Sequence, residues 1–515
     1  MNQNNISAAE LFQRVRELLM LPELEPQTRN KMMHDTLILC CHEGVKDTKQ
    51  AFGNLFSQVD YLCKARGIKV ADKIAIQTMR RHSNSQEPLS GEDLKYDARA
   101  LALFISAVFG VDVPHELNVL IPHTPRPYQK GLEINNRRIR CIVKNWDGDF
   151  IRVDIDQDAD EEEYLVQLKD EENHIDHTYL WDILKEGMQL NLLDCQVKQP
   201  IITPRLIVVE PDYLVDISSI ATCFTAFGHH PLLYLLNLMK PRANTQATLL
   251  GNFAGAALDD IINSHGKYQM NETVKTNFRE KALEFCTCPW FDPTKFYTDA
   301  SLQAFNLQQV VDILFPRTAS QAQMTALRGE SLYDRKKAIL EPSFVCEALG
   351  IQGRVDLMTT DCKLLVEQKS GRNMNIETHQ VDPGYHSYQL EPHYVQLLLY
   401  YGVLQHNFKL SNDRVNIRLL YSKYRPQDGL MVVAYYQKLF KEAIQYRNQL
   451  VAASFEIAKE GFEHALNEFT PEVLNVAGTQ DFFYNKYLKP QIEAITKPLH
   501  DLSPLEEAYF CRMMT

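Results

Sequence analysis

Apolar residues recur along this chain with two different periods, and the period changes at positions that suggest domain boundaries. Up to about residue 118 the spacing is helical. The first helix is expected to begin at Ser7, because Ser7-Ala8-Ala9-Glu10 resembles a capping box. We therefore predict a helical accessory domain over residues 1–122, which could bind a partner. Further helices are expected at Asp35–Cys41, Ala51–Ala65, Asp72–Arg81 and Leu94–Phe109.

A proline-rich segment, Pro122–Pro127, reads as a linker, and the pattern after it changes to short strands. Small barrels of the OB type are built from such strands. After about residue 210, strand-like and helix-like segments mix, which is typical of an α+β or α/β domain. The strands expected before residue 210 are Arg138–Val143, Phe150–Ile155, Gln189–Val197 and Arg205–Val209.

The stretch from Gly353 to Gly371 contains the most informative pattern, G-R-V-D-L-M-T-T-D-C-K-L-L-V-E-Q-K-S-G. It predicts two short strands that turn at residues 359–361. Asp356 is expected on the first strand. Glu367 and Lys369 are expected on the second, and their spacing of two places both side chains on one face. Two carboxylates and one lysine should therefore converge at the end of a hairpin.

This group suits metal-assisted hydrolysis of a phosphodiester. Asp356 and Glu367 offer the hard oxygen ligands that Mg²⁺ or Mn²⁺ prefers, and the main-chain carbonyl of Gln368 is a candidate third ligand. Lys369 could orient the attacking water and offset negative charge. An ordinary edge hairpin with a surface Glu-x-Lys pair is the alternative, since that pair is common by chance. The full string is more specific than the pair.

A second pattern, His393-x-x-Gln396-Leu397-x-x-Tyr400, lies in an apolar helical stretch. Gln396 and Tyr400 are four residues apart and share one helix face, from which they could bind phosphate or hold the metal ligands. The alternative is a half-buried tyrosine beside a solvated glutamine. Arg354, Arg372 and His393 lie next to these motifs and are candidate substrate-binding residues.

The order G-x-x-D, E-x-K, Q-x-x-x-Y resembles the PD-(D/E)xK nuclease superfamily, in its RecB-like branch. More closely, the chain resembles the OB-plus-nuclease part of the Dna-two type replication helicase–nucleases, and Leu206–Met239 is similar to the segment by which they enter the nuclease domain. The resemblance covers roughly residues 130 to 510. It implies an OB-like barrel over 128–209 and a restriction-endonuclease-like core over 210–436, with a mixed central sheet flanked by helices. A helical extension over 437–515 could lead to a helicase.

Two positions depart from the family pattern. The family usually carries a histidine in G-x-x-x-H, but Gly255 stands at that position here. Asp259, one helical turn later, could replace it as a ligand, although a solvated surface role is the ordinary alternative. Many relatives also bind an iron–sulfur cluster with one cysteine before the core and three after it. Cys223 is near the first position, but Cys511 alone follows Tyr400, so no iron–sulfur cluster is expected.

Three further expectations concern the core. The segment Gly251–Asn263 should be its first helix, and Trp290 and Phe291 should pack a helix end. The segment Arg372–Glu391 should be a long polar loop, which could close over DNA or be disordered.

Composition narrows the functional classes. The chain has 515 residues, of which 45% are hydrophobic and 23% charged, as in globular proteins. A net charge of −12 argues against broad coating of nucleic acid, but DNA contact can be confined to one basic channel. The eleven cysteines lack zinc spacing and suggest reduced thiols in the cytoplasm. The absence of a long apolar run predicts no membrane partner, and the absence of G-x-x-x-x-G-K-[ST] predicts no ATP hydrolysis by this chain.

The leading hypothesis is an enzyme, a metal-dependent DNA nuclease acting on single-stranded DNA, flaps or ends. It would be coupled to a helicase, in cis or in trans, in replication, repair or defence. A catalytically weak module that binds DNA ends or a partner is the main alternative, because the family histidine is missing at Gly255. A protein–protein scaffold built on the N-terminal helices is a third, weaker hypothesis.

Overall fold

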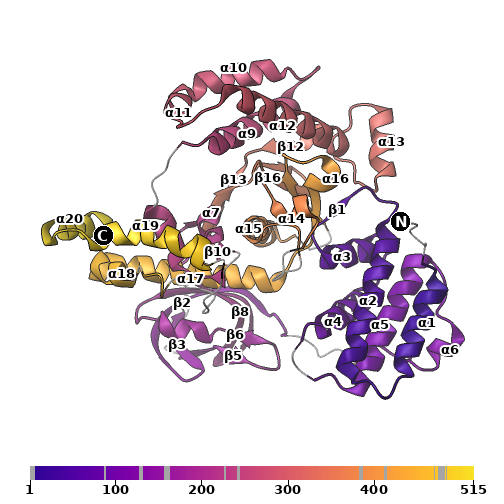
Figure 1. The fold of residues 1–515 in the computed structure, drawn as a ribbon. Coiled ribbons are helices and arrows are strands. Elements are labelled where there is room, and N and C mark those ends of the chain that lie inside the picture. Colours follow the sequence, from indigo (N-terminus) through magenta and orange to yellow (C-terminus); the bar gives the residue numbers. More distant parts are fainter. Residues whose placement is uncertain are drawn as a thin grey trace.

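The computed structural model describes a mixed α/β chain built from a helical bundle, a barrel and a larger sheet-and-helix body (Figure 1). The residues it describes are 6–85, 88–126, 132–155, 163–225, 228–239, 244–381, 387–410, 414–468, 470–473, 482 and 484–515. The prediction of a long loop over 372–391 was wrong in part, because helix α14 (Met374–Thr378) lies within it and helix α15 begins at Glu391. Residues 382–386 lie outside the described set, as does the end of the predicted linker at Pro127.

The N-terminal bundle begins as predicted. Ser7 caps the first helix, accepting a hydrogen bond from the Glu10 N–H, and the Glu10 carboxylate accepts one from the Ser7 N–H in return. Such reciprocal capping satisfies two otherwise unpaired donors. The helices pack their apolar faces into one core. They are α1 (Ala8–Leu19), α2 (Pro26–Val45), α3 (Leu55–Ala65), α4 (Val70–His82), α5 (Gly91–Phe109) and α6 (His115–Asn118).

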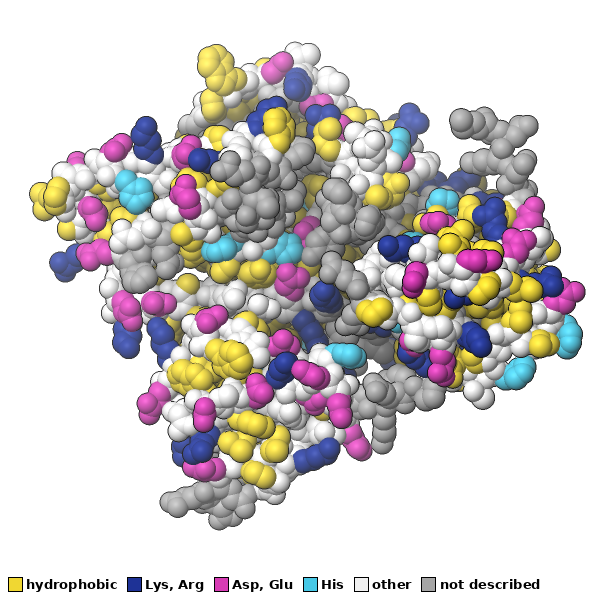
Figure 2. All heavy atoms as spheres, turned by 60° about the horizontal axis from the view of Figure 1, so that its bottom comes forward, with side chains coloured by type: hydrophobic (Ala, Val, Ile, Leu, Met, Phe, Trp, Pro, Cys, Tyr) yellow, Lys and Arg dark blue, Asp and Glu magenta, His cyan; other side chains and the backbone are white. Residues whose placement is uncertain are grey.

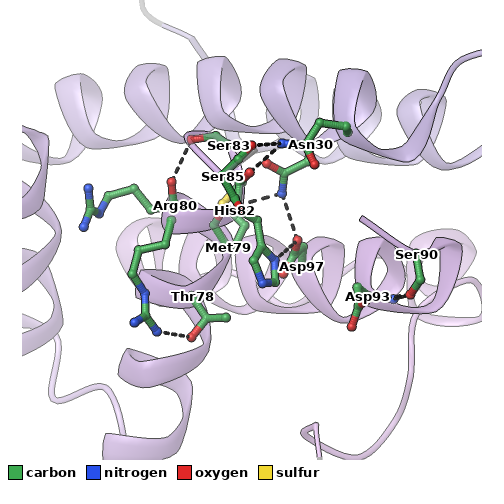
Figure 3. Close-up of polar contacts among 12 residues, drawn as sticks. Asn30, Thr78, Met79, Arg80, His82, Ser83, Ser85, Ser90, Asp93 and Asp97 are labelled. Atoms are coloured by element: carbon green, nitrogen blue, oxygen red, sulfur yellow. Dashed lines mark hydrogen bonds and ion pairs between the residues drawn. The ribbon is translucent and has the colours of Figure 1, made fainter. Parts of the chain in front are cut away.

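A polar cluster links three of these helices inside the bundle (Figure 3). The Asp97 carboxylate on α5 lies 2.8 Å from the amide nitrogen of Asn30 on α2 and 2.8 Å from Nδ1 of His82 on α4. Asn30 and Asp97 are both buried. Because a buried carboxylate is costly without partners, these contacts fix the relative register of the three helices.

The prediction of one helix over Ala51–Ala65 was wrong at its start. Ala51–Phe52 forms strand β1, which pairs in parallel with β18 (Leu430–Val433) at the edge of the central sheet. The pairing continues beyond the strand, because the Gly53 N–H donates to the Val432 carbonyl at 3.0 Å. An open sheet edge exposes unpaired backbone groups, and β1 provides hydrogen-bond partners for those of β18. The first 122 residues are thus joined to the core by backbone hydrogen bonds.

The barrel is closed and five-stranded, in the order β2-β3-β4-β8-β7. Such a barrel is consistent with the OB-like prediction. The shortest of its strands, β4, was absent from the sequence prediction. The strands are β2 (Asn136–Asp147), β3 (Phe150–Ile155), β4 (Tyr164–Gln167), β7 (Gln189–Lys198) and β8 (Ile201–Val209), and the connection from β4 to β7 carries β5 (Lys169–Asp170), β6 (Ile175–Asp176) and a 3₁₀ turn (Thr178–Asp182).

The central sheet has six strands in the order β1-β18-β17-β16-β15-β12 and is mixed, since β16 and β17 are parallel while β15 and β16 are antiparallel. A smaller sheet has the order β13-β14-β9, and two of its strands, β13 and β14, come between β12 and β15 in the sequence. The strands are β12 (Ala338–Leu340), β15 (Leu357–Thr359), β16 (Leu364–Lys369) and β17 (Asn416–Tyr421), with β9 (Val215–Asp216), β13 (Ser343–Cys346) and β14 (Ile351–Arg354) in the smaller sheet.

Helices cover both faces of the central sheet, and β16 divides its side chains between them. Leu364 and Val366 pack in the cluster with α9 (Gln246–Asn263) and α12 (Pro293–Leu314). Leu365 packs in the cluster with α15 (Glu391–Phe408) and α17 (Gln437–Glu460). The remaining helices of this body are α7 (Ile217–Ala221), α10 (Met270–Glu280), α11 (Ala282–Cys286), α13 (Ala319–Leu327), α14 (Met374–Thr378) and α16 (Pro426–Gly429), with a 3₁₀ turn at Arg335–Lys337.

The C-terminal helices pack against a segment that precedes the core in sequence. Their apolar residues form one cluster with α8 (Leu232–Met239), at the end of the chain marked C in Figure 1. A short ribbon, β10 (Phe224–Thr225) and β11 (Gly228–His229), leads into α8. The C-terminal elements are α18 (Phe462–Glu468), a π-helical turn (Tyr484–Leu488), α19 (Lys489–His500) and α20 (Pro504–Met514). Among the described helices, none has the length and apolar character needed to cross a membrane.

The surface carries mixed charge. Acidic and basic side chains are intermingled over the face shown in Figure 2.

Arg447 on α17 joins the barrel to the core. Its fully buried guanidinium donates to the carbonyls of Gly350 (3.1 Å), Glu210 (2.9 Å) and Tyr213 (2.6 Å), and also to that of Val209. Those carbonyls lie at the end of β8, after it, and just before β14. One side chain therefore satisfies backbone acceptors from both bodies.

We expect Arg447→Met to lower the free energy of unfolding by about 3 kcal/mol or more, because it leaves several buried carbonyls without donors. Lys459→Met, at an exposed position of the same helix, is the matched control and should be nearly neutral. Urea denaturation of both variants measures the difference. Equal midpoints for the two variants would contradict a joining role for Arg447.

Candidate active site at the end of strand β16

Asp356 lies in a bend between two sheets. It was predicted on a strand, but the structure breaks that strand in two, so that β14 belongs to the small sheet and β15 to the central sheet. Asp356 falls between them, and its Oδ2 accepts a 2.6 Å hydrogen bond from the Gln368 N–H on β16. The predicted hairpin is present, and the bend aims its first carboxylate at the end of the second strand.

Glu367 and Lys369 share a face of β16, as their spacing predicts. The Lys369 ammonium donates to Glu367 Oε1 at 2.8 Å and to Gln396 Oε1 on α15, also at 2.8 Å. The carboxylate is buried, whereas 22% of the lysine side chain is exposed. The lysine therefore connects a buried carboxylate to the surface and is held by groups from two elements.

Tyr400 contacts the backbone that precedes Asp356. Its hydroxyl donates to the Arg354 carbonyl at 2.6 Å. A Cβ added to Gly353 would come within 3.0 Å of the tyrosine ring, tighter than ordinary contact, so glycine lets the ring lie against the strand. The glycine of G-R-V-D and the tyrosine of Q-x-x-x-Y are thus one packing unit. Tyr400 positions the Asp356 bend, and its hydroxyl is occupied by this contact.

The carboxyl groups here hold their protons unusually strongly. Burial, followed by repulsion from Asp356, raises the pKa of Glu367 to about 8 even though Lys369 opposes the shift. Burial is also the main cause of the raised pKa of Asp356, where the Gln368 N–H opposes it. Perturbed carboxyl groups of this kind mark candidate functional sites.

Two further carboxylates join the cluster electrostatically. Burial, then the charges of Glu341, Asp260 and Asp356, raise the pKa of Asp259 on α9 to about 7. Glu341 follows β12, where its N–H donates to the Asp356 carbonyl at 3.0 Å. Sequence analysis weighed Asp259 but missed Glu341, because no motif surrounds it and only strand pairing brings it near.

The space around Gly255 is open, because a Cβ there would meet no atom within 4 Å. Gly255 and Asp259 are four residues apart on α9 and therefore lie on the same side of that helix. The glycine therefore leaves space on the side of α9 that carries Asp259.

The three candidate substrate-binding residues are not equivalent. Arg354 pairs with Glu341 at 3.0 Å, and its side chain is mostly exposed. Arg372, also exposed, pairs with Glu377 at 2.5 Å. Burial lowers the pKa of His393 to about 3, and its Nδ1 lies 3.1 Å from the Tyr421 hydroxyl. The two arginines can reach a ligand, whereas the neutral His393 is engaged inside the domain.

The donor set can be tested for its fit to Mg²⁺ or Mn²⁺. Among the described residues, no three His, Cys, Asp or Glu side chains are close enough together to hold a metal ion. Asp356 and Glu367 supply hard oxygens. Among the described residues the buried Glu367 Oε2 has no hydrogen-bond partner of normal geometry, although the Asp356 N–H lies close enough to lower the pKa of Glu367. Two buried carboxyl groups that repel each other suit a cation. The residues present would therefore offer a divalent ion these two carboxylates, with the Gln368 carbonyl as the predicted third ligand.

We expect Glu367→Gln to stabilise the metal-free protein at alkaline pH. A carboxyl whose pKa rises on folding destabilises the native state progressively as pH increases from about 4.5 to 8. The variant should match wild type near pH 4.5 and exceed it by about 5 kcal/mol above pH 8, since each pKa unit of the rise from 4.5 to about 8 corresponds to about 1.4 kcal/mol. Denaturation in EDTA at several pH values measures this, with exposed Glu347→Gln as control. A pH-independent difference would contradict the expectation.

No family model and no curated protein matches this chain.

Proposed function

We propose that the protein is a divalent-metal-dependent nuclease that hydrolyses phosphodiester bonds in DNA. The observation that carries the proposal is the Lys369 ammonium, held between Glu367 and Gln396 beside Asp356 at the end of β16. Three sequence motifs, at Asp356, at Glu367–Lys369 and at Gln396, contribute to this single group. A surface Glu-x-Lys pair would be exposed, whereas here the glutamate is 2% exposed.

Lys369 is the group that would act on the water or the phosphate. Its ammonium has three donors, of which Glu367 and Gln396 engage two. The remaining N–H can donate to an attacking water or to a phosphate oxygen, and the positive charge offsets the charge that develops on phosphate. Gln396 restrains the amine from the opposite element, so the lysine is held before substrate arrives.

Asp356 and Glu367 would hold the metal ion, with the Gln368 carbonyl beside them. A bound Mg²⁺ or Mn²⁺ supplies Lewis-acid stabilisation of the phosphate and lowers the pKa of a bound water. The Gln368 N–H keeps one Asp356 oxygen oriented, which leaves the other available. Tyr400 fixes the bend that carries Asp356 and acts through position alone.

A second function, a DNA-end-binding or partner-binding module with weak catalysis, is favoured by one observation. Within the described ranges no three His, Cys, Asp or Glu side chains come together as metal ligands, and a Cβ at Gly255 would meet no atom within 4 Å. Weak metal binding in the presence of DNA would favour this module over the enzyme. We propose single-stranded DNA, flaps or ends as substrate, and a helicase as partner in cis or in trans, on the sequence resemblance alone.

We expect Asp356→Asn and Lys369→Gln each to reduce Mn²⁺-dependent cleavage of a labelled oligonucleotide by at least about 100-fold, because each removes charge that acts at the transition state. Asp361→Asn, in the turn of the same hairpin, is the control and should cleave like wild type. Circular dichroism verifies folding. Equal cleavage by wild type and both site variants would identify a contaminating nuclease and overturn the proposal.

We expect Gly255→His to increase Mn²⁺ affinity about tenfold, equivalent to about 1.4 kcal/mol, because an imidazole would enter open space on the Asp259 side of α9. Isothermal titration calorimetry measures the affinity without requiring activity. Ala256→His, on the adjacent and differently directed position of the helix, should leave affinity unchanged. The same affinity in both variants would show that this side of α9 does not face the metal.

A further inference from the structure

A cavity of about 640 Å³ opens beside the candidate active site. Its walls come from the first turn of α9, from α12, from the segment after β16 and from Lys423. The segment after β16 begins with Ser370, the residue next to Lys369, so the cavity adjoins the catalytic strand directly. Its volume falls within the range of about 300 to 1,000 Å³ that is usual for ligand sites.

The wall nearest to β16 is fixed by hydrogen bonds. The Gln303 amide on α12 donates to the Ser370 carbonyl at 3.1 Å and accepts from the Ser422 hydroxyl at 2.6 Å. The Gln368 side chain donates to the same hydroxyl at 3.3 Å. Gln303 and Ser422 are both buried. The cavity is therefore rigidly connected to the strand that carries Glu367 and Lys369.

Trp290 stands at the edge of this cavity and is 98% exposed. The sequence predicted that Trp290 and Phe291 pack a helix end, but only Phe291 does so, with its ring centroid 5.3 Å from that of Phe285 and 5.5 Å from that of Phe296. The Trp290 backbone is left-handed, with φ of 57°. A bulky residue in this conformation costs about 1–3 kcal/mol, and such strain clusters at functional sites. The strain presents the indole to solvent.

Three basic side chains line the cavity in an acidic protein. Lys295, Arg372 and Lys423 line it, against Asp292 and Asp299. Asp292 is occupied as the cap of α12, where it accepts the Lys295 N–H at 3.0 Å. Arg372 and Lys423 share Glu377, at 2.5 and 3.3 Å. Within the described part of the chain, the Lys295 ammonium has no ion pair, so it is available to a phosphate.

We infer that this cavity binds an unpaired stretch of nucleic acid, with one base stacked on Trp290 and its phosphates near Lys295 and Lys423. An exposed indole can stack on any base face that is free, whereas the bases of a duplex already stack on each other. The inference rests on the proposed function in one respect, namely that the bound nucleic acid runs from the cavity toward Lys369. It names single-stranded DNA as the ligand of a site outside the catalytic group.

The first test measures binding in EDTA, where cleavage does not occur. We expect Trp290→Ala to weaken binding of a fluorescein-labelled oligo(dT) by about 5- to 100-fold, the loss associated with one base–aromatic stack. Trp290→Phe keeps a ring and should restore most of the affinity. Tyr509→Ala, which removes an exposed aromatic from α20, is the matched control and should bind like wild type. Blunt duplex should bind all four proteins equally.

The second test measures salt dependence. Lys295→Gln should reduce the slope of log K against log salt by about 0.7, the value for one phosphate contact on a single strand. Unchanged oligo(dT) affinity in Trp290→Ala overturns the inference, as does an equal loss for duplex. These outcomes separate the two proposals. If Asp356→Asn abolishes cleavage while Trp290→Ala binds normally, the nuclease stands without this site. If no protein cleaves DNA while Trp290→Ala loses binding, the site stands without the nuclease.

Discussion

Two carboxyl groups, Asp356 and Glu367, are held out of water beside each other, and the rest of the site depends on how the fold tolerates this. Their mutual repulsion and their burial both favour the protonated forms, which is why the pKa of Glu367 rises to about 8. Lys369, the Gln368 N–H and the packing of Tyr400 each reduce the cost or fix the geometry. The fold tolerates this local instability at one end of β16, where we propose that a cation binds.

Local sequence patterns predicted the parts of this site that lie on regular elements. The alternation along a strand placed Glu367 and Lys369 together, and the spacing of four on a helix placed Gln396 and Tyr400 together. Patterns failed where long-range pairing decides the outcome. Glu341 has no motif, and the bend at Asp356 arises because its two flanking strands join different sheets. Trp290 was misassigned since hydrophobicity alone predicts burial for both aromatic neighbours.

The helices and strands of the fold were likewise predictable where local patterns determine them and not where long-range pairing does. Helix caps and strand alternation located most of the bundle and most of the barrel, but the four-residue strand β4 was too short to stand out. The two residues of β1 precede a good helix and were absorbed into it, because a propensity window cannot detect a partner strand near residue 431. Their role is visible only in the assembled sheet.

The pairing of β1 with β18 has a consequence for how this protein is made. During synthesis β1 leaves the ribosome long before its neighbour exists, so the bundle can fold while the strand waits without a partner. The central sheet is complete only when β1, near residue 51, pairs with β18, near residue 431. Contacts between segments so far apart in the sequence slow folding. Until then β18 has an unpaired edge, to which the β1 strand of another molecule could pair. A domain-swapped dimer is therefore the misfolded form that this topology favours.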